Sequence, residues 1–385
     1  MKVILISNYF SHHQEPFSLE MDKLTNHQYI FIATQRIPES RVKSGGFEDI
    51  NEKYPWILRA YEYERAQTQK VIDDADVVIL GDASGELVRN RIKQGKLTFV
   101  YSERPLKQKM PFYKYPFRLI TWRKKNPHYK KAFLLCASAF TYTDFSKMFL
   151  FRNRGFKWGY FPVAKRYEDV LGLIANKKPN SILWGGRLLS LKHPELAVEV
   201  AKKLYDSGYN FELNIIGVGE QEKRLHELIE KYRLTNVVHM LGVKTTHELR
   251  KYMEDSQIFI FSSDRNEGWG AVLNESMNSA CAVVASSAIG SVPFLINDGE
   301  NGLIFKDRDV DSLFLKVKQL IDNPINREKL SLAGYKTITE EWCAEEAAER
   351  LIKLFEALLN KKDKWLFKTG PCSKAEIIKD NWYKG

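Results

Sequence analysis

The sequence predicts an α/β protein made of two Rossmann-like, doubly wound domains that face each other across a cleft. Three observations lead to this fold class. The chain has 385 residues, a length that favours two domains over one. Short, nearly continuous apolar runs alternate with longer segments of helical periodicity, as in parallel sheets covered by helices on both faces. This alternation occurs in two successive series, which indicates two sheets.

The first series fills the first half of the chain. Its apolar runs predict strands, and the longer periodic segments between them predict helices. The strands are expected at 3–7, 29–33, 77–80, 97–101, 133–137 and 158–161, with helices around 59–72 and 86–94.

The second series begins after the polar stretch that contains Pro179. Pro194 suits the first position of a helix, where a missing backbone N–H costs nothing. Strands are expected at 181–184, 211–216, 237–241, 258–261, 282–285 and 303–305, and helices at 194–206, 221–232, 246–255, 271–280, 310–321, 326–341 and 344–359.

These series define the expected domain boundaries. The first domain should cover 1–163 and the second should cover 180–341, with 164–179 as a linker. Residues 342–385 follow the second sheet and contain a helix with its own apolar stripe. We therefore expect this last part to cross back to the first domain.

Composition excludes several classes of protein. With 44% hydrophobic and 28% charged residues, the chain is neither disordered nor fibrous. Its best apolar run, 132–140, is about half the ~18–20 residues of a membrane span, and the start lacks a signal-peptide cleavage site. The four cysteines, at 136, 281, 343 and 372, form no CxxC pair, so no disulfide framework or zinc site is expected. We expect a soluble cytoplasmic protein.

One segment concentrates positive charge. Between Tyr101 and Lys131, ten basic residues and the single acid Glu103 give a local charge of +9, with aromatic residues interleaved. Such a segment suits nucleic acid, an anionic membrane or an acidic ligand, and an ordinary solvated face is equally compatible. No nucleic-acid-binding motif accompanies it, so no nucleic acid partner is expected. Our hypothesis is that residues 104–131 dock on the inner face of the membrane.

The densest group of polar and glycine residues follows the strand expected at 258–261. Gly268 and Gly270 permit close approach of a ligand, and the amides of Ala271 and Val272 at the next helix start suit an anion. Glu267 and Glu275 can then hold the hydroxyl groups of a sugar and a ribose. The alternative is that these two residues are a capping acid and a surface acid.

Two further groups follow other strands of the second series. Arg187 and Lys192 come after the strand at 181–184 and could neutralise a diphosphate without a metal, or could be solvated surface cations. The segment IIGVGE, which contains Gly217, lacks the third glycine of a dinucleotide fingerprint. A sharp turn explains that segment about as well as a nucleotide contact does.

In the first half, His12 and His13 follow the first strand, and Glu103 and Arg104 follow the strand at 97–101. Adjacent histidines seldom coordinate one ion, so polar contact with a molecule in the cleft is the better interpretation. The Asp74–Asp76 pair resembles a DxD metal motif, but it precedes a strand and therefore lies at the opposite edge of the sheet. We expect no metal and no cofactor.

The second half resembles the family-4 retaining glycosyltransferases of the GT-B fold, also described as group 1. The resemblance covers about residues 181–351 and rests on GGRLLSLKH, IIGVGE, LGVKTTHEL, SDRNEGWGAVLNESM, SSAIGSVPFLINDGENGLIF and the following tryptophan at 342. It implies that Arg187, Lys192 and Glu267 are catalytic. The implied donor-binding residues are Gly186, Gly217, Val243, Lys244, Gly268, Trp269, Gly270, Ala271, Val272 and Glu275.

In the first half the sequence departs from the family, because SHHQEP replaces a common glycine pair. His12, His13, Glu103 and Arg104 are the candidate acceptor-side residues. The implied reaction is retaining transfer of a sugar from a nucleotide-diphosphate donor, UDP-linked in preference to GDP-linked, to a glycan or lipid-linked saccharide during cell-surface polysaccharide synthesis. The alternatives are a nucleotide-sugar hydrolase or epimerase of the same fold and, remotely, a nucleic-acid-binding protein.

Overall fold

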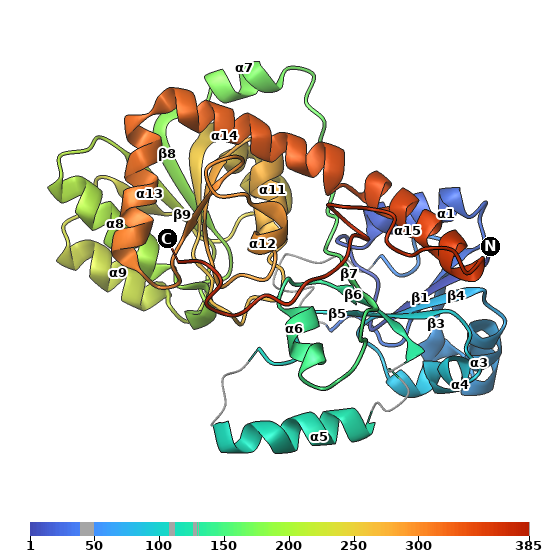
Figure 1. The fold of residues 1–385 in the computed structure, drawn as a ribbon. Helices are drawn as coiled ribbons and strands as arrows, with labels where there is room; N and C mark the ends of the chain where they lie inside the picture. Colours follow the sequence, from blue (N-terminus) through green and yellow to red (C-terminus); the bar gives the residue numbers. More distant parts are fainter. Residues whose placement is uncertain (39–49, 108–111, 126–128, 130, 385) are drawn as a thin grey trace. The chain divides into compact units, whose positions relative to one another are not determined.

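The computed structural model describes residues 1–38, 50–107, 112–125, 129 and 131–384 (Figure 1). The chain divides into two compact units. The first comprises Met1–Val163 and Trp342–Lys379, and the second comprises Ala164–Glu341 together with the last described residues, from Asp380 onward. The parts of the basic segment at 108–111, 126–128 and 130 lie outside the described residues.

The first unit contains a parallel sheet with the strand order β3-β2-β1-β4-β5-β6-β7. Its strands are short and largely buried, as the apolar runs predict. They are β1 Val3–Ser7, β2 Tyr29–Ala33, β3 Ile57–Arg59, β4 Val77–Leu80, β5 Thr98–Ser102, β6 Phe133–Cys136 and β7 Gly155–Lys157.

Helices cover both faces of this sheet. One face carries α3, α4 and α6, whose apolar side chains join a core with alternate strand residues, and α5 packs on the same cluster through Leu119 and Trp122. On the other face α1 and α15 pack together, and Phe355 contacts Phe99 with ring centroids 5.1 Å apart. The helices are α1 Glu15–Leu24, α3 Arg65–Asp73, α4 Arg89–Lys93, α5 Tyr115–Lys125, α6 Thr141–Ser146 and α15 Ala344–Leu359.

The second unit contains a parallel sheet with the order β10-β9-β8-β11-β12-β13. Its strands are β8 Lys178–Gly185, β9 Glu212–Ile216, β10 Val238–Met240, β11 Ser256–Phe261, β12 Ala282–Ser286 and β13 Leu303–Phe305. Because β8 and β11 are neighbours, the loops that follow them leave the same edge side by side.

Two layers of helices enclose this second sheet (Figure 1). Helices α8, α9 and α13 share one core with the alternate strand residues, and α14 adds Leu330 to this core, while α10, α11 and α12 cover the other face. Helix α14 packs against α11, α13 and β12. The helices are α7 Val170–Ala175, α8 Glu195–Asp206, α9 Glu222–Lys231, α10 Thr246–Asp255, α11 Val272–Asn278, α12 Val292–Leu295, α13 Val310–Asp322 and α14 Pro324–Lys336.

Local chemistry explains where several of these helices begin. Thr245 and Glu248 form a reciprocal capping box at the start of α10. Thr245 is the N-cap, and the helix begins at Thr246, as the sequence predicts. Asp309 accepts a hydrogen bond from the Ser312 amide at the start of α13. Pro324 occupies the first turn of α14, where its missing N–H is tolerated.

Four sequence expectations differ from the structure. Residues 164–179, expected as a linker, belong to the second unit and contain α7 and the start of β8. A strand, β3, occupies Ile57–Arg59, where helical periodicity seemed to begin. The strand expected at 158–161 lies three residues earlier, as β7, because Phe156 and Leu135 are partners in the ladder. From Asp380 onward the chain belongs to the second unit rather than to the segment that packs with the first.

Candidate active site

The loops that follow β8 and β11 are tied together at the carboxyl edge of the second sheet. The Ser262 hydroxyl lies 2.8 Å from the carbonyl oxygen of Lys192 and accepts a hydrogen bond of 2.9 Å from Trp184 Nε1. The Asp264 amide donates to the carbonyl of Leu191 at 2.9 Å. The neighbouring strands thus bring two sequence-predicted groups into one place.

Lys192 and Glu267 form an ion pair across these two loops. Their side chains are only 16% and 14% exposed, so water screens the pair weakly. Ser263 Oγ donates to the same carboxylate oxygen of Glu267 at 3.1 Å, and Lys192 Nζ lies 5.8 Å from the centre of the Phe261 ring. The cation expected to meet a phosphate and the carboxylate expected to meet a sugar are therefore direct partners.

A third charged group, which the sequence interpretation missed, lies beside this pair. His193 has a left-handed backbone (φ 47°) and places its ring between two carboxylates. Nδ1 is 2.9 Å from Glu195 Oε1, and Nε2 is 3.5 Å from Asp264 Oδ2. Asp264 and then Glu195 raise the pKa of His193 to about 9, so this ring is a cation at neutral pH. The sequence contained one indication of this role, because His193 directly follows Lys192.

The glycines after β8 and β9 have a packing role. Gly186 and Gly217 have φ of 155° and 139°, and a Cβ on Gly217 would lie 1.9 Å from the Gly186 carbonyl oxygen. The Gly186 amide donates to the carbonyl of Ile216 at 3.0 Å. These contacts favour the sharp-turn interpretation of IIGVGE and explain why position 217 requires glycine.

The loop after Glu267 requires glycine for a similar reason. Gly270 has φ 81°, and a Cβ there would lie 2.3 Å from Phe261 Cζ. Gly268 is buried. Ala271 and Val272 lie at the start of α11. The first backbone N–H groups of a helix have no carbonyl partner within the helix.

Trp269 does not fit its expected role in donor binding. Its side chain is fully buried, and its indole Nε1 donates to Asn274 Oδ1 at 2.9 Å. The backbone carbonyl of Trp269 accepts a hydrogen bond of 2.6 Å from Ser291 Oγ. The ring is therefore part of the core that supports the loop and presents no surface to a ligand.

Glu275 lies one turn into α11 and is mostly buried. Desolvation raises the pKa of this carboxyl to about 7, while the nearby charge of Arg250 acts in the opposite direction. Arg250 is held by Asn278, with 2.7 Å between Nη1 and Oδ1. Glu275 is therefore partly protonated at neutral pH, unlike an ordinary surface acid.

The remaining donor-side candidates lie along the same edge. Arg187 is exposed in the loop after β8. Val243 is 60% exposed, and Lys244 is partly exposed; both follow β10, two strands away from β8. The Gly217 amide donates to the carbonyl of Gly242 at 2.8 Å, which fixes these loops to one another.

In the first unit, three of the four acceptor-side candidates gather around a tyrosine. The rings of His13 and Tyr160 stack with their centroids 6.4 Å apart, and the ring centroids of His12 and His13 are 3.9 Å apart. The Tyr160 hydroxyl donates to Glu103 Oε1 at 2.6 Å, and Lys107 also pairs with Glu103. Burial and His12 lower the pKa of His13 to about 3, so its ring is neutral. Tyr160 was missed because it follows β7, whose position the sequence placed three residues late.

Arg104 departs from the expectation that it faces an acceptor. Its guanidinium is buried against Asp144, with both contacts at 3.2 Å, and lies 4.8 Å from the Phe140 ring centre. Asp144 also accepts a hydrogen bond of 3.1 Å from the Leu106 amide. Arg104 is therefore a core residue of the first unit.

The Asp74–Asp76 pair, which resembles a DxD metal motif, contributes a hydrogen bond to the first sheet. Asp76 Oδ2 accepts a hydrogen bond of 2.8 Å from the Lys2 amide before β4 begins, which is the amino edge of the sheet. Across the described ranges, no group of three or more His, Cys, Asp or Glu residues is arranged to hold a metal. The four cysteines are buried free thiols.

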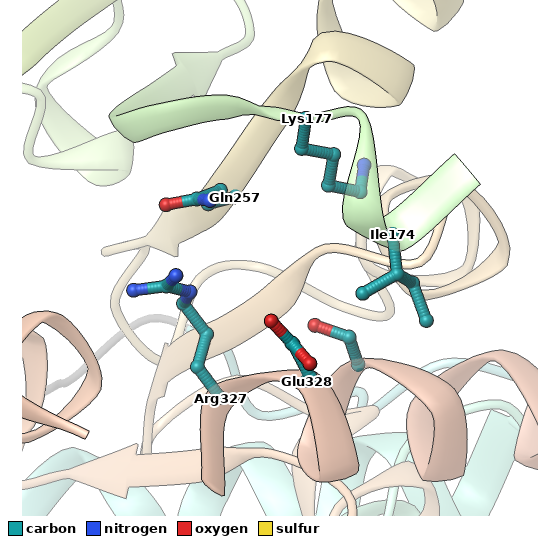
Figure 2. A pocket seen from close by; sticks show the side chains of 6 residues that line it. Ile174, Lys177, Gln257, Arg327 and Glu328 are labelled. Atoms are coloured by element: carbon teal, nitrogen blue, oxygen red, sulfur yellow. The ribbon is translucent and has the colours of Figure 1, made fainter. Parts of the chain in front are cut away.

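A small cavity lies at the opposite edge of the second sheet (Figure 2). It has about 10 Å³, room for roughly one water molecule, and is lined by Ile174, Lys177, Gln257, Arg327, Glu328 and Ser331. Lys177 precedes β8, and its ammonium donates to the carbonyls of Met253 and Ser279 at 2.8 and 2.9 Å. The cavity lies at the amino edge of the sheet, away from the carboxyl edge that carries the candidate site.

Comparisons with known proteins agree with this architecture. Residues 172–337 match the family described as glycosyl transferases group 1. A protein of Salmonella typhimurium named as a colanic acid biosynthesis glycosyltransferase is 30% identical over 146 residues, which is 37% of this chain and 36% of that protein. The amylovoran biosynthesis glycosyltransferase of Erwinia amylovora is 27% identical over 186 residues, or 47% and 46% of the two chains.

Solved structures share the fold along most of the chain. The crystal structure of Anabaena HepE in complex with UDP aligns with a TM-score of 0.70 and 13% identity, covering 93% of this chain and all of the other. The fold is therefore GT-B. The matches to the two sequence relatives span between 36% and 46% of those proteins' lengths.

Proposed function

We propose that the chain is a retaining glycosyltransferase that moves a sugar from a nucleotide-diphosphate donor to a saccharide acceptor in polysaccharide synthesis. The observation that carries this proposal is the pairing of Lys192 with Glu267 across the loops after β8 and β11, beside the cationic ring of His193. Positive charge for a diphosphate and a carboxylate for sugar hydroxyls meet at one sheet edge.

The similar proteins support particular substrates. HepE was solved with UDP, and the pneumococcal O-GlcNAc transferase GtfA was solved with UDP and GlcNAc, with a TM-score of 0.55. These complexes favour a UDP-sugar donor over a GDP-sugar. The names of two relatives, from colanic acid and amylovoran biosynthesis, favour a saccharide acceptor.

The proposed chemistry is mainly electrostatic. As the bond between the sugar C1 and the diphosphate oxygen breaks, negative charge develops on the phosphates, and Lys192 and Arg187 stabilise it. The acceptor hydroxyl forms the new bond to C1 from the face that the phosphate leaves, and its proton passes to a phosphate oxygen. Glu267 holds sugar hydroxyls, and Glu275 holds the ribose. No metal takes part in these steps.

The acceptor is proposed to meet the first unit at Glu103 and Tyr160. A carboxylate and a phenol joined by a 2.6 Å hydrogen bond offer oxygen lone pairs that accept hydrogen bonds from saccharide hydroxyl groups. Neutral His13 adds a further hydrogen-bonding ring. Arg104 is left out of this set because Asp144 holds it in the core.

We also propose that helix α5 attaches the protein to an anionic membrane surface. On one side of α5, Trp122 packs against Phe145 at 5.0 Å. On the other side, Phe117 and Ile120 are 74% and 52% exposed, and Tyr113, one turn earlier, is 58% exposed. An outward apolar stripe within a sequence segment of charge +9 matches a helix that lies in a lipid headgroup layer. In the described part of the chain, none of the helices could span a bilayer.

Product analysis tests the enzymatic proposal. The protein is incubated with UDP-glucose, UDP-galactose, UDP-GlcNAc or GDP-mannose, with and without saccharide acceptors, in the presence of EDTA. We expect nucleoside diphosphate release that depends on an acceptor, and NMR should show the donor's anomeric configuration in the product. Free sugar released without an acceptor would indicate a hydrolase, an isomerised donor would indicate an epimerase, and activity restored only by magnesium would refute metal independence.

Liposome co-sedimentation tests the membrane proposal. At low salt the protein should pellet with anionic vesicles and remain in solution with neutral ones. Replacing Phe117 and Ile120 by serine, or Arg123, Lys124 and Lys125 by glutamate, should abolish pelleting. The matched control is Lys223→Glu, because this lysine is 90% exposed on α9. A parent protein that stays in the supernatant with anionic vesicles would refute the proposal.

A further inference from the structure

A short segment late in the chain, which we call the strap (residues 380–384), packs on the second unit. The Trp382 indole donates to the carbonyl oxygen of Ser287 at 2.9 Å, directly after β12. The Tyr383 hydroxyl lies 2.7 Å from the carbonyl oxygen of Ile304, in β13, and 2.9 Å from Asp298 Oδ2. In Figure 1 the red end of the chain, marked C, is drawn with this unit.

The Tyr383 contact joins a network that already fixes the end of the sheet. Asp298 accepts a hydrogen bond of 2.8 Å from the Ile304 amide and pairs with Lys316 of α13 at 3.1 Å. Tyr383 therefore binds a carboxylate that is held by two other elements. Anchored at two adjacent strand ends, the strap has little freedom to leave as a rigid piece.

The strap also reaches the loop that carries Glu267. Asp380 Oδ2 lies 3.5 Å from Arg265 Nη2, and Arg265 is two residues before Glu267. The Arg265 side chain is 19% exposed and that of Asp380 is 52% exposed. The neighbouring residue Asp264 holds the same loop through Leu191 and His193. The loop 262–271 is thus held by contacts to the β8 loop and by a contact to the strap.

We propose that Asp380 is a positioning residue that holds the donor-binding loop through Arg265, with Trp382 and Tyr383 as the anchors of the strap. The identity of the ligand, a nucleoside diphosphate, rests on the proposed function. The contact between the strap and the loop does not depend on that function. Because Asp380 is half exposed, its ion pair is weak, so its loss should loosen the loop locally rather than unfold the unit.

Hydrogen exchange of the full chain without ligand tests the bracing. In Asp380→Asn, amides of the peptide covering 262–271 should exchange about 2–5-fold faster, with the melting temperature unchanged. Asp380→Glu should restore the parent rate, and the combined Trp382→Ala, Tyr383→Phe change should accelerate exchange at least as much as Asp380→Asn. Lys384→Gln is the control, since this exposed lysine lies in the same segment. Unchanged exchange in both Asp380→Asn and the combined variant would overturn the proposal.

Calorimetric titration with UDP and GDP separates the strap from the proposed function. If the parent protein binds neither nucleotide, the proposed function fails and the strap is judged by exchange alone. If the parent binds UDP, Asp380→Asn should weaken the affinity about 2–5-fold, and Asp380→Glu should recover it. Unchanged affinity alongside faster exchange would overturn the positioning role for the donor.

Discussion

Glu275 should make the protein less stable as the pH rises from about 4.5 to neutrality. Burial raises the pKa of this carboxyl to about 7 from a usual value of 4.5, so the folded state binds a proton that the unfolded chain has already released. Stability is therefore lost between about pH 4.5 and pH 7, and the loss is complete above pH 7. With 1.36 kcal/mol per pKa unit, the full cost is about 3 kcal/mol.

The variant Glu275→Gln removes this cost because its amide does not ionise. Relative to the parent, it should gain about 2–3 kcal/mol more at pH 8 than at pH 5, which is several degrees in melting temperature for a unit of this size. Differential scanning calorimetry at the two pH values measures the gain, and Glu227→Gln, an exposed acid on α9, is the control. An equal effect of Glu275→Gln at both pH values would refute the reasoning.

Three further outcomes follow from the geometry. Lys192→Ala should lower turnover on the order of 10²-fold in a protein that still folds. Steady-state kinetics would contradict this if Lys192→Ala were as active as the control Lys223→Ala. Gly217→Ala should destabilise the fold by about 1–3 kcal/mol or prevent folding, because its Cβ would overlap a facing carbonyl oxygen; a normal thermal melt would argue against a packing role. Asp144→Ala should cost about 3–5 kcal/mol in urea unfolding, since it leaves the buried charge of Arg104 without its carboxylate, and a loss below about 1 kcal/mol would show that the pair is dispensable.

The regular elements were predictable wherever the apolar pattern was continuous. Strand β1 and helix α10 have the predicted bounds, because an unbroken apolar run and a clear period of 3.6 leave little choice. Strand β3 was not predictable, since its three residues carry only one buried side chain and pair at the sheet edge. An edge strand of three residues is too short to show the alternation of apolar and polar residues that predicts a strand.

The meeting of the loops after β8 and β11 was predictable, but the side-chain contacts between them were not. Adjacent parallel strands must bring their following loops together, and this placed Lys192 near Glu267. That the two would pair with each other depends on side-chain orientation, which no sequence pattern encodes. Trp269 shows the same limit, because an aromatic residue in a glycine-rich loop can face a ligand or the core, and here Asn274 holds it in the core.

Long-range contacts account for the residues that were missed. Tyr160 meets Glu103 across 57 residues of sequence, and Asp380 meets Arg265 across a still longer separation. Arg104 was assigned to the acceptor because it follows a strand, but its partner Asp144 lies 40 residues later. Only the folded chain shows these partners.

The central claim is that a nucleoside diphosphate binds where the loops after β8 and β11 meet. Hydrogen exchange of the full chain, measured with and without saturating UDP and with GDP for comparison, locates the bound nucleotide directly. Protection should concentrate in peptides covering 186–193 and 262–275, and Lys192→Ala should reduce it. Protection confined to other parts of the chain, in a protein that binds the nucleotide, would contradict the account.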